Sequence, residues 1–259
     1  MVAAVGKSLE ALMRQLSVKA ILFCMLMTLG PTSAWAAGNE IQLRSTLTKD
    51  EFHSLSRELG FALSYFPLAP AAPLGVTGFD IWIEATAVDI SEQSSYWQKA
   101  VKDGNPPSML IVPKLHAQKG LPFNLDVGII YSTVPDTNIS LLGGELKWAF
   151  IEGGVAMPAL ALRGSYTKLL GVDELDLDTY GADLSISKRA LFMTPYAGIG
   201  AVWIKSSTDS RLLATQFNET QSLTKAFVGL KMHLPLFSLV AEADFSTVAA
   251  YSLRANLSF

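Results

Sequence analysis

The sequence predicts an all-β fold: a transmembrane antiparallel up-and-down β-barrel of about ten strands, preceded by a short N-terminal helical segment. Three observations predict it. From residue 76 onward the chain divides into ten segments of about ten residues, the length that a tilted strand needs to cross a bilayer. Within most segments apolar and polar residues alternate, as lipid on one face and a polar interior on the other require. The long connectors all fall at one end of the resulting barrel.

The last nine residues show the alternation without interruption. Apolar side chains occupy one face (Tyr251, Leu253, Ala255, Leu257, Phe259) and polar ones the other (Ser252, Arg254, Asn256, Ser258). A final strand that ends in Phe resembles the closing strand of the outer-membrane β-barrel proteins of Gram-negative bacteria. The resemblance implies a cell outer-membrane location. It also implies an assembly signal, read by the barrel assembly machinery, at Tyr251, Leu253, Leu257 and Phe259.

Residues 1–36 are interpreted as a secretory signal peptide. Lys7, Arg14 and Lys19 form a basic region, and the apolar core at 20–30 is too short to span a bilayer comfortably. Small residues at 34 and 36 predict cleavage after residue 36 or 37. An uncleaved anchor is the alternative. A lipoprotein site at Cys24 is rejected because bulky Phe23 precedes it.

The composition of the remaining chain excludes several classes of function. Cys24 is the only cysteine, so the mature chain can form no disulfide and no thiolate metal site. Without residues 1–36, 17 basic residues face 22 acidic ones, a balance of −5 that argues against nucleic-acid binding. No stretch beyond residue 37 is apolar enough for a transmembrane helix. A soluble β-sandwich shares the alternation but not the ordering of the connectors.

The N-terminal segment at 37–75 is expected to contain a short amphipathic helix. Thr48 and Glu51 have the spacing of a capping box, and Phe52, Leu55 and Leu59 follow at helical spacing. This helix either rests at the membrane surface or enters the barrel as a plug. Alternatively, Leu59–Phe66 is an extra strand that, with one more, would make twelve. The proline-rich stretch at 67–73 acts as a stiff connector.

The ten strands of the predicted barrel at 76–259 follow in order. The seventh is apolar on both faces, and its sides are not assigned; every other strand has one apolar and one polar face. Their ranges are Val76–Val88, Ser108–Gln118, Phe123–Ser132, Ile139–Phe150, Met157–Lys168, Asp176–Ser187, Met193–Lys205, Ser222–His233, Phe237–Ser246 and Tyr251–Phe259.

The connectors set the orientation of the barrel. Bacterial barrels have short periplasmic turns and longer external loops. The predicted external loops are 89–107, 133–138, 169–175, 206–221 and 247–249, and the predicted periplasmic turns are 119–122, 151–156, 188–192 and 234–236. Aromatic residues cluster at both predicted ends, as interfacial girdles do.

The predicted interior carries charges of both signs in nearly equal number. They are Asp80, Glu84, Lys114, Asp126, Glu145, Lys147, Arg163, Asp183, Lys225, Lys231, Glu242, Asp244 and Arg254. Ten strands lie nearer to the eight of a filled barrel than to the sixteen or more of an open porin. A packed or plugged interior, held by ion pairs, is therefore favoured over an open pore.

Catalytic and metal chemistry are weakly supported by the sequence. The histidines are His53, His116 and His233, the last two at predicted periplasmic strand ends, whereas barrel enzymes resembling this chain keep their sites at the external rim. The acidic run at 173–178 lacks the glycine and spacing of a calcium loop. We expect no catalytic residues, no metal and no cofactor.

The expected function is a small passive channel or a structural, surface-binding protein, with loops 89–107 and 206–221 as the contact surface. Tyr96 and Trp97 in the first of these loops are a candidate contact point, and anchoring at the membrane interface explains them as well. An outer-membrane enzyme of the lipid hydrolase or protease type is the alternative. The expected partners are outer-membrane lipid, lipopolysaccharide and the assembly machinery, with no nucleic acid, and the protein is expected to be a monomer.

Overall fold

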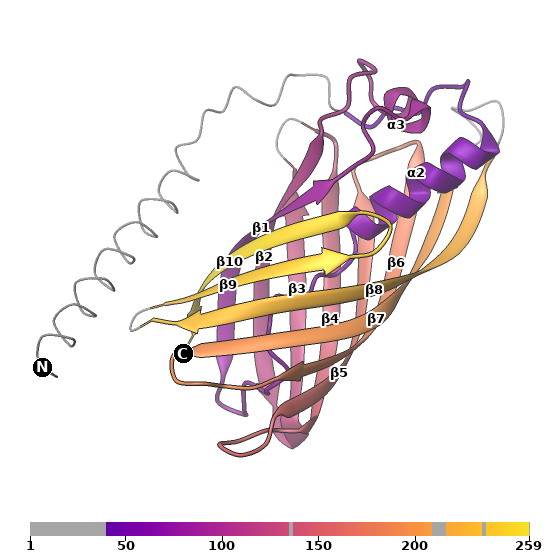
Figure 1. Cartoon of the computed structure of the whole chain (residues 1–259). Helices are drawn as coiled ribbons and strands as arrows, with labels where there is room; N and C mark the ends of the chain where they lie inside the picture. The colour runs from indigo at the N-terminus through magenta and orange to yellow at the C-terminus, as the bar shows by residue number, and fades with distance from the viewer. Residues whose placement is uncertain (1–39, 135–136, 209–215, 235–236, 259) are drawn as a thin grey trace, which may run out of the picture. The chain divides into compact units, whose positions relative to one another are not determined.

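The computed structural model describes residues 40–258 except 135–136, 209–215 and 235–236. The predicted signal peptide and Phe259 therefore lie outside the described residues. Ten antiparallel strands form one closed barrel, in which each strand pairs with its neighbours in the chain and β1 pairs with β10 (Figure 1). The predicted ten-stranded antiparallel barrel with a short N-terminal helical segment is confirmed. Its strands are β1 (Phe79–Asp89), β2 (Met109–Leu121), β3 (Leu125–Thr133), β4 (Ser140–Ile151), β5 (Ala159–Leu170), β6 (Leu175–Ser187), β7 (Met193–Thr208), β8 (Asn218–His233), β9 (Ser238–Phe245) and β10 (Ala249–Ser258).

The barrel has two dissimilar ends. The turn end carries connectors 122–124, 152–158, 188–192 and 234–237 and the end of β10. The loop end carries 90–108, 134–139, 171–174, 209–217 and 246–248. Helix α3 (Ser95–Ala100) lies in the first of these loops, and helix α2 (Lys49–Ala62) lies beside it at the loop end (Figure 1). The longest connector is thus at the loop end, as predicted.

The alternation of the sequence becomes an apolar exterior and a buried interior. Side chains of one face are exposed at the outer wall, for example Ile83 and Ile129, both 62% exposed. Their strand neighbours, such as Glu84 and Ile130, are buried inside. Such a continuous apolar belt is what lipid solvates on one face of a barrel.

Two predicted strand starts are wrong for local reasons. β1 begins at Phe79 rather than Val76, because Gly75 and Gly78 form a turn with a 2.9 Å hydrogen bond from the Gly78 N–H to the Gly75 carbonyl. β3 begins at Leu125, because Phe123 and Asn124 have positive φ angles in the short 3-10 helix η1 (Pro122–Asn124). A residue at positive φ cannot continue a strand.

The predicted external loop 206–221 is also wrong in extent. Residues 206–208 continue β7 and residues 218–221 continue β8, with Ser206 paired to Glu219 and Lys205 to Thr220. Both faces of this extension carry polar residues, so no hydrophobic alternation reveals it. The β7–β8 hairpin is therefore longer than the sequence indicates.

Helix α2 begins with the predicted capping box. The Thr48 side chain accepts a hydrogen bond from the Glu51 N–H, and the Glu51 side chain accepts one from the Thr48 N–H at 2.9 Å. The helix contacts β6, β7 and β8. It ends at Ala62, and residues 63–66 are not in a strand, so the alternative of a strand at 59–66 and a twelve-stranded barrel is wrong. No helix within the described part of the chain is long and apolar enough to cross a membrane.

Candidate functional site: a filled lumen under a loop-end cover

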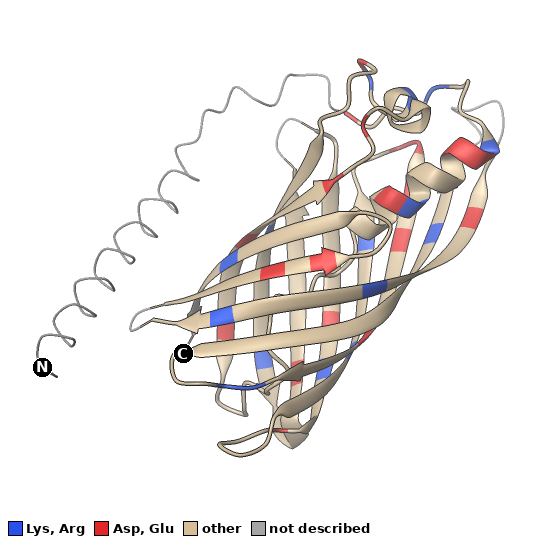
Figure 2. Ribbon diagram, in the orientation of Figure 1, with Lys and Arg blue, Asp and Glu red and all other residues tan. Residues whose placement is uncertain are grey.

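All thirteen charged residues that the sequence assigns to the interior are buried. The most exposed of them, Lys231, is 9% exposed, and Asp126 and Asp244 are 0% exposed. Figure 2 shows these charges as isolated bands along strands that are otherwise uncharged over most of their length. A water-sized probe barely reaches these side chains, so the polar interior is occupied rather than open.

Residues 49–74, which we call the plug, occupy the interior. The plug consists of α2 and a luminal segment at 63–74 that follows it. Its large apolar side chains between residues 52 and 68 are fully buried, including Phe52, Leu55, Leu59 and Phe66. At Gly60 an added Cβ would lie 2.6 Å from the Ile204 side chain, so α2 approaches β7 too closely for a larger residue. Ile204, on the inward face of β7, is therefore apolar because it packs against this helix rather than against lipid.

The luminal segment is bound mainly through its backbone. Because this segment pairs with no strand, its backbone groups lack the hydrogen-bond partners of a sheet, and a buried backbone group without a partner is costly. Side chains of the lumen supply those partners instead. The Leu68 N–H donates to both Glu242 oxygens at 3.0 and 3.1 Å, and the Leu68 carbonyl accepts from Arg254 at 2.7 Å. Further along, Lys147 donates to the carbonyls of Pro70 and Ala72, and Asp126 accepts from the Leu74 N–H.

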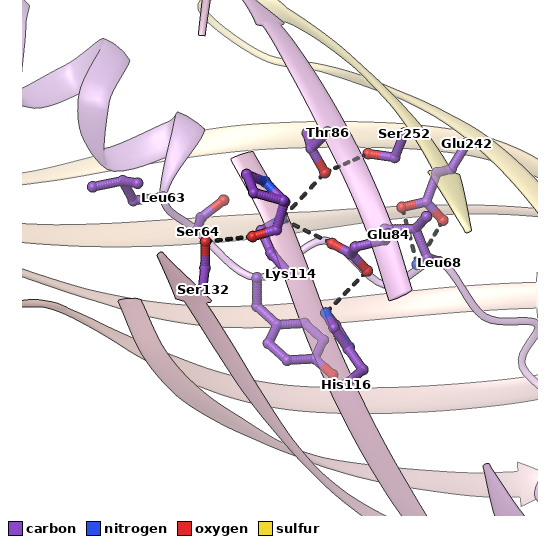
Figure 3. Close-up of polar contacts among 12 residues, drawn as sticks. Leu63, Ser64, Leu68, Glu84, Thr86, Lys114, His116, Ser132, Glu242 and Ser252 are labelled. Atoms are coloured by element: carbon purple, nitrogen blue, oxygen red, sulfur yellow. Dashed lines mark hydrogen bonds and ion pairs between the residues drawn. The ribbon is translucent and has the colours of Figure 1, made fainter. Parts of the chain in front are cut away.

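Glu84 is the centre of one buried charge group (Figure 3). Its carboxylate lies 3.0 Å from Lys114 Nζ, 2.9 Å from His116 Nε2 and 3.2 Å from Trp82 Nε1. The His116 ring stacks on Trp82 with centroids 4.6 Å apart. These donors offset the cost of removing the Glu84 carboxylate from water, so the carboxylate can be buried inside the barrel.

Four further ion pairs connect neighbouring strands or strands one apart. Asp126 lies 2.8 Å from Lys147, Glu145 2.6 Å from Arg163, and Asp183 3.1 Å from Lys225; Asp80 and Arg254 join β1 to β10 across the closing seam. Among the described residues, Lys231 makes no ion pair, and Asp244 lies beside a second carboxylate, that of Glu242. The network is therefore mostly, but not completely, paired.

A second arrangement closes the loop end above the plug. Glu58 of α2 is 4% exposed and accepts hydrogen bonds from the Ser91 N–H at 3.1 Å, the Ser91 hydroxyl at 2.7 Å, the Tyr96 hydroxyl at 2.8 Å and Trp97 Nε1 at 2.7 Å. We call residues 90–108, with α3, the cover. Trp97 is 2% exposed. The interpretation of Trp97 as an exposed contact point is therefore wrong, because its indole N–H is used to bind the plug; Tyr96 is half-buried on the same carboxylate.

Glu51, the capping-box residue in the first turn of α2, makes a second attachment to the cover. Its carboxylate lies 2.7 Å from Lys99 Nζ and accepts a 2.6 Å hydrogen bond from the Ser95 hydroxyl. The ion pair with Lys99, followed by the hydrogen bonds from Ser95 and Thr48, lowers the pKa of Glu51 from 4.5 to about 2. Two carboxylates of one helix thus hold the cover in place.

The sequence did not single out Glu58, although a signal for it exists. Glu58 lies three residues after Leu55 and one before Leu59, on the apolar side of the amphipathic helix. A carboxylate at such a position must find donors when the helix is buried. The partners themselves lie 33 to 39 residues away in the chain, and no local pattern identifies them.

The three histidines lie far apart in the fold and form no common site. His53 is 48% exposed at the loop end beside Glu219, His116 is buried in the Glu84 group, and His233 ends β8 with Nε2 3.0 Å from the Thr194 hydroxyl. In the described part of the chain no group of three or more His, Cys, Asp or Glu side chains could hold a metal ion. In the acidic run, Asp178 is bound by the Tyr166 hydroxyl at 2.6 Å.

The predicted assembly residues lie on the outer wall where they are described. Tyr251 is 50% and Leu253 44% exposed there. Leu257 pairs with Ile81 across the seam, and Phe259 lies outside the described residues.

Similarity of this chain to known proteins is found among solved structures. No family model and no curated protein matches the chain. The structure is similar to the N-terminal β-barrel domain of Pseudomonas aeruginosa OprF, at 13% identity over 70% of this chain and 97% of that one, with a TM-score of 0.34. It is also similar to Ail, the attachment invasion locus protein of Yersinia pestis, at 13% identity, 70% and 98% coverage, and a TM-score of 0.32.

A further similar structure is Neisserial surface protein A, at 11% identity over 70% of this chain and 95% of that one, with a TM-score of 0.31. The structural neighbours are outer-membrane β-barrel proteins. At these identities and TM-scores no residue role carries over from them. The chemistry of the site rests on this chain's own residues.

Proposed function

We propose that this protein is an outer-membrane barrel with a sealed interior, a structural or surface-binding protein rather than a constitutive channel. The support for a membrane location is the outer wall. Large apolar side chains on it are widely exposed, among them Ile83, Ile129, Val228 and Leu253, and no described element covers them. A water-soluble protein rarely exposes so large a contiguous apolar surface, whereas lipid solvates it.

The observation that carries the proposal is the filled interior. The plug lies among thirteen buried charged residues, and the cover binds the plug at the loop end through Glu58 and Glu51. An ion crossing the barrel would have to displace backbone groups that are hydrogen-bonded to Glu242, Arg254 and Lys147. The barrel thus offers its loop-end surface, not its interior, for contact with other molecules.

The orientation follows from connector length. Short turns face the periplasm and longer loops face outward in bacterial barrels, so we place the loop end at the cell surface. Outer-membrane lipid and lipopolysaccharide then surround the wall, and the assembly machinery acts during insertion. We propose a monomer without cofactor and without nucleic-acid contacts.

The same geometry argues against catalysis. The buried His116 is enclosed by Glu84, Trp82 and the plug residue Tyr65, whose ring lies 5.5 Å from the imidazole. A substrate could not reach this histidine without removal of the plug. Within the described part of the chain, His53 at the loop end has only Glu219 as a charged partner and no nucleophile among its hydrogen-bond partners.

Single-channel recording in a planar bilayer tests the proposal. The refolded mature protein, with folding verified by a heat-dependent gel shift, should show no steady conductance. Glu58→Ala, combined with Lys147→Met, removes two attachments of the plug and serves as the comparison. Steady conductance of the unmodified protein would overturn the sealed-barrel proposal in favour of a passive channel. Conductance of only the double variant supports it and shows that the plug is the seal.

A further inference from the structure

The N-terminal part of the described chain is anchored at the loop end. Residues 40–44 run beside the cover: Ile41 bridges to Val101, the Gln42 N–H donates to the Ala100 carbonyl at 2.8 Å, and the Arg44 N–H donates to the Lys99 carbonyl at 3.0 Å. Glu40 forms an ion pair with Lys102 at 2.8 Å. This short stretch thus adds a strand-like edge to the cover.

A second loop holds the same stretch. The Asn138 side chain in the connector between β3 and β4 accepts from the Ile41 N–H at 2.9 Å and donates to the Ile41 carbonyl at 3.0 Å. Ile41 and Leu43 are buried, whereas Ser45 and Thr46 are exposed. Residues 40–48 are therefore fixed to two separate loops at the loop end.

From this anchor the chain descends through the whole barrel. The Leu63 carbonyl binds Thr167, near the loop end of β5, and Leu68 binds Glu242 and Arg254. Leu74 then binds Asp126, one residue into β3 at the turn end. Gly78 finally accepts from the Gly120 N–H at the turn end, and β1 begins.

We infer that residues 40–74 form a strap that crosses the barrel from end to end, so that residues 40–48 are displayed at the outer surface of the cell. This inference rests on the proposed function, which places the loop end outside. The N-terminal part of the mature chain then passes outward through the interior, while the last strand returns to the periplasmic side. The outward surface then contains residues 40–48 in addition to the loops.

The strap also constrains assembly. β1 follows the strap directly, and Arg254 of β10 binds both Asp80 of β1 and the Leu68 carbonyl of the strap. The same guanidinium therefore closes the seam and holds the strap. Placement of the strap and pairing of β1 with β10 therefore depend on one shared side chain, Arg254.

Single-cysteine labelling tests the inference in whole cells. Cys24 is the only cysteine of the chain and lies in the predicted signal peptide, so each introduced thiol is unique in the mature protein. The probe is a membrane-impermeant maleimide. The variants are Ser45→Cys on the strap, Asp173→Cys as the loop-end control and Val155→Cys, at a fully exposed position, as the turn-end control. A heat-dependent gel shift verifies that each variant is folded.

Three outcomes separate the inference from the proposed function. If Ser45→Cys and Asp173→Cys label in intact cells, and Val155→Cys labels only after permeabilisation, the inference is supported. If Asp173→Cys labels in intact cells but Ser45→Cys does not, the strap is not displayed and the inference fails while the proposed orientation holds. If only Val155→Cys labels in intact cells, the proposed orientation fails, and surface display of the strap fails with it.

Discussion

Adjacent residues on one strand face opposite environments, so a substitution that suits one position is unfavourable at the next. Val127 on β3 is 41% exposed on the outer wall, and its neighbour Asp126 is completely buried and paired with Lys147. The strand therefore tolerates a charge at one position and requires an apolar residue at the next.

Leu253→Arg, near the middle of β10, should reduce barrel stability, because a lipid-facing charge near the membrane midplane costs about 2–4 kcal/mol. Val127→Arg, two residues from the turn end of β3, should cost less, because the cost falls toward the membrane interface. Phe123→Arg is the control, since Phe123 is 87% exposed in the turn after β2, where such a charge costs about 0–1 kcal/mol. Urea unfolding in lipid vesicles measures the differences. Equal stability of all three variants would contradict the assignment of the outer face.

Glu58 is the residue on which the cover depends most. Glu58→Ala leaves the Trp97 indole N–H, the Tyr96 hydroxyl and the Ser91 N–H without an acceptor, at about 1–3 kcal/mol for each group that stays buried. The cover should therefore detach, with faster protease cleavage within 90–108 and a shift of Trp97 fluorescence toward that of an exposed indole. Glu58→Gln, which keeps one acceptor oxygen, should be affected less. Unchanged cleavage in Glu58→Ala would show that the cover is held by other contacts.

At the scale of the element, the contact between α2 and α3 should depend on pH. The pKa of Glu51 is about 2 in the folded protein against an ordinary 4.5, mainly because of its ion pair with Lys99. A folded-state pKa below the unfolded one adds stability that is complete above pH 4.5 and is lost as the pH falls toward 2. Hydrogen exchange of residues 95–100, measured relative to the intrinsic amide exchange rate at each pH, should accelerate over this range.

Glu51→Gln is the control for that pH dependence. Glutamine does not titrate, so the part of the acceleration due to Glu51 should be absent from the variant, and exchange above pH 4.5 should already be faster. A pH profile identical in both proteins would show that other carboxylates attach the cover.

Elements with one lipid face and one polar face could be predicted from sequence alone. β9 and β10 are examples, since Glu242, Asp244 and Arg254 alternate with apolar residues that lie outside. The two faces of β7 could not be assigned from sequence, because Val202 and Ile204 are apolar although they face inward. Their apolar character suits packing inside the barrel and not contact with lipid. The packing partner is α2, which lies more than a hundred residues earlier in the chain.

The candidate site was only half predictable for a related reason. Alternation identifies which charges face the interior, since it is a local property of each strand. It does not show which charges pair, nor that Lys225 and Lys147 bind backbone carbonyls of the plug. Those contacts depend on the path of residues 63–74, which have no periodic pattern of their own.

At the scale of the whole molecule, plug and barrel should behave as one cooperative unit. The plug supplies hydrogen-bond partners to Lys147, Lys225, Glu242 and Arg254, which lie on four different strands. Loss of the plug would remove these hydrogen bonds, and a hydrogen bond to a charged group contributes roughly 1.5–3 kcal/mol. If the plug opened independently of the barrel, the stability of the barrel would not depend on these hydrogen bonds.

Hydrogen exchange of the luminal segment tests this cooperativity. The N–H groups of Leu68, Ala71 and Leu74 donate to Glu242, Ser187 and Asp126 and should exchange as slowly as those of the strands. Glu242→Gln should accelerate exchange at Leu68 more than at Leu74, because only the first N–H loses a charged acceptor. Rapid exchange at all three positions in the unmodified protein, with the strands protected, would show a plug that opens by itself. The sealed interior would then be one state of a barrel that also conducts.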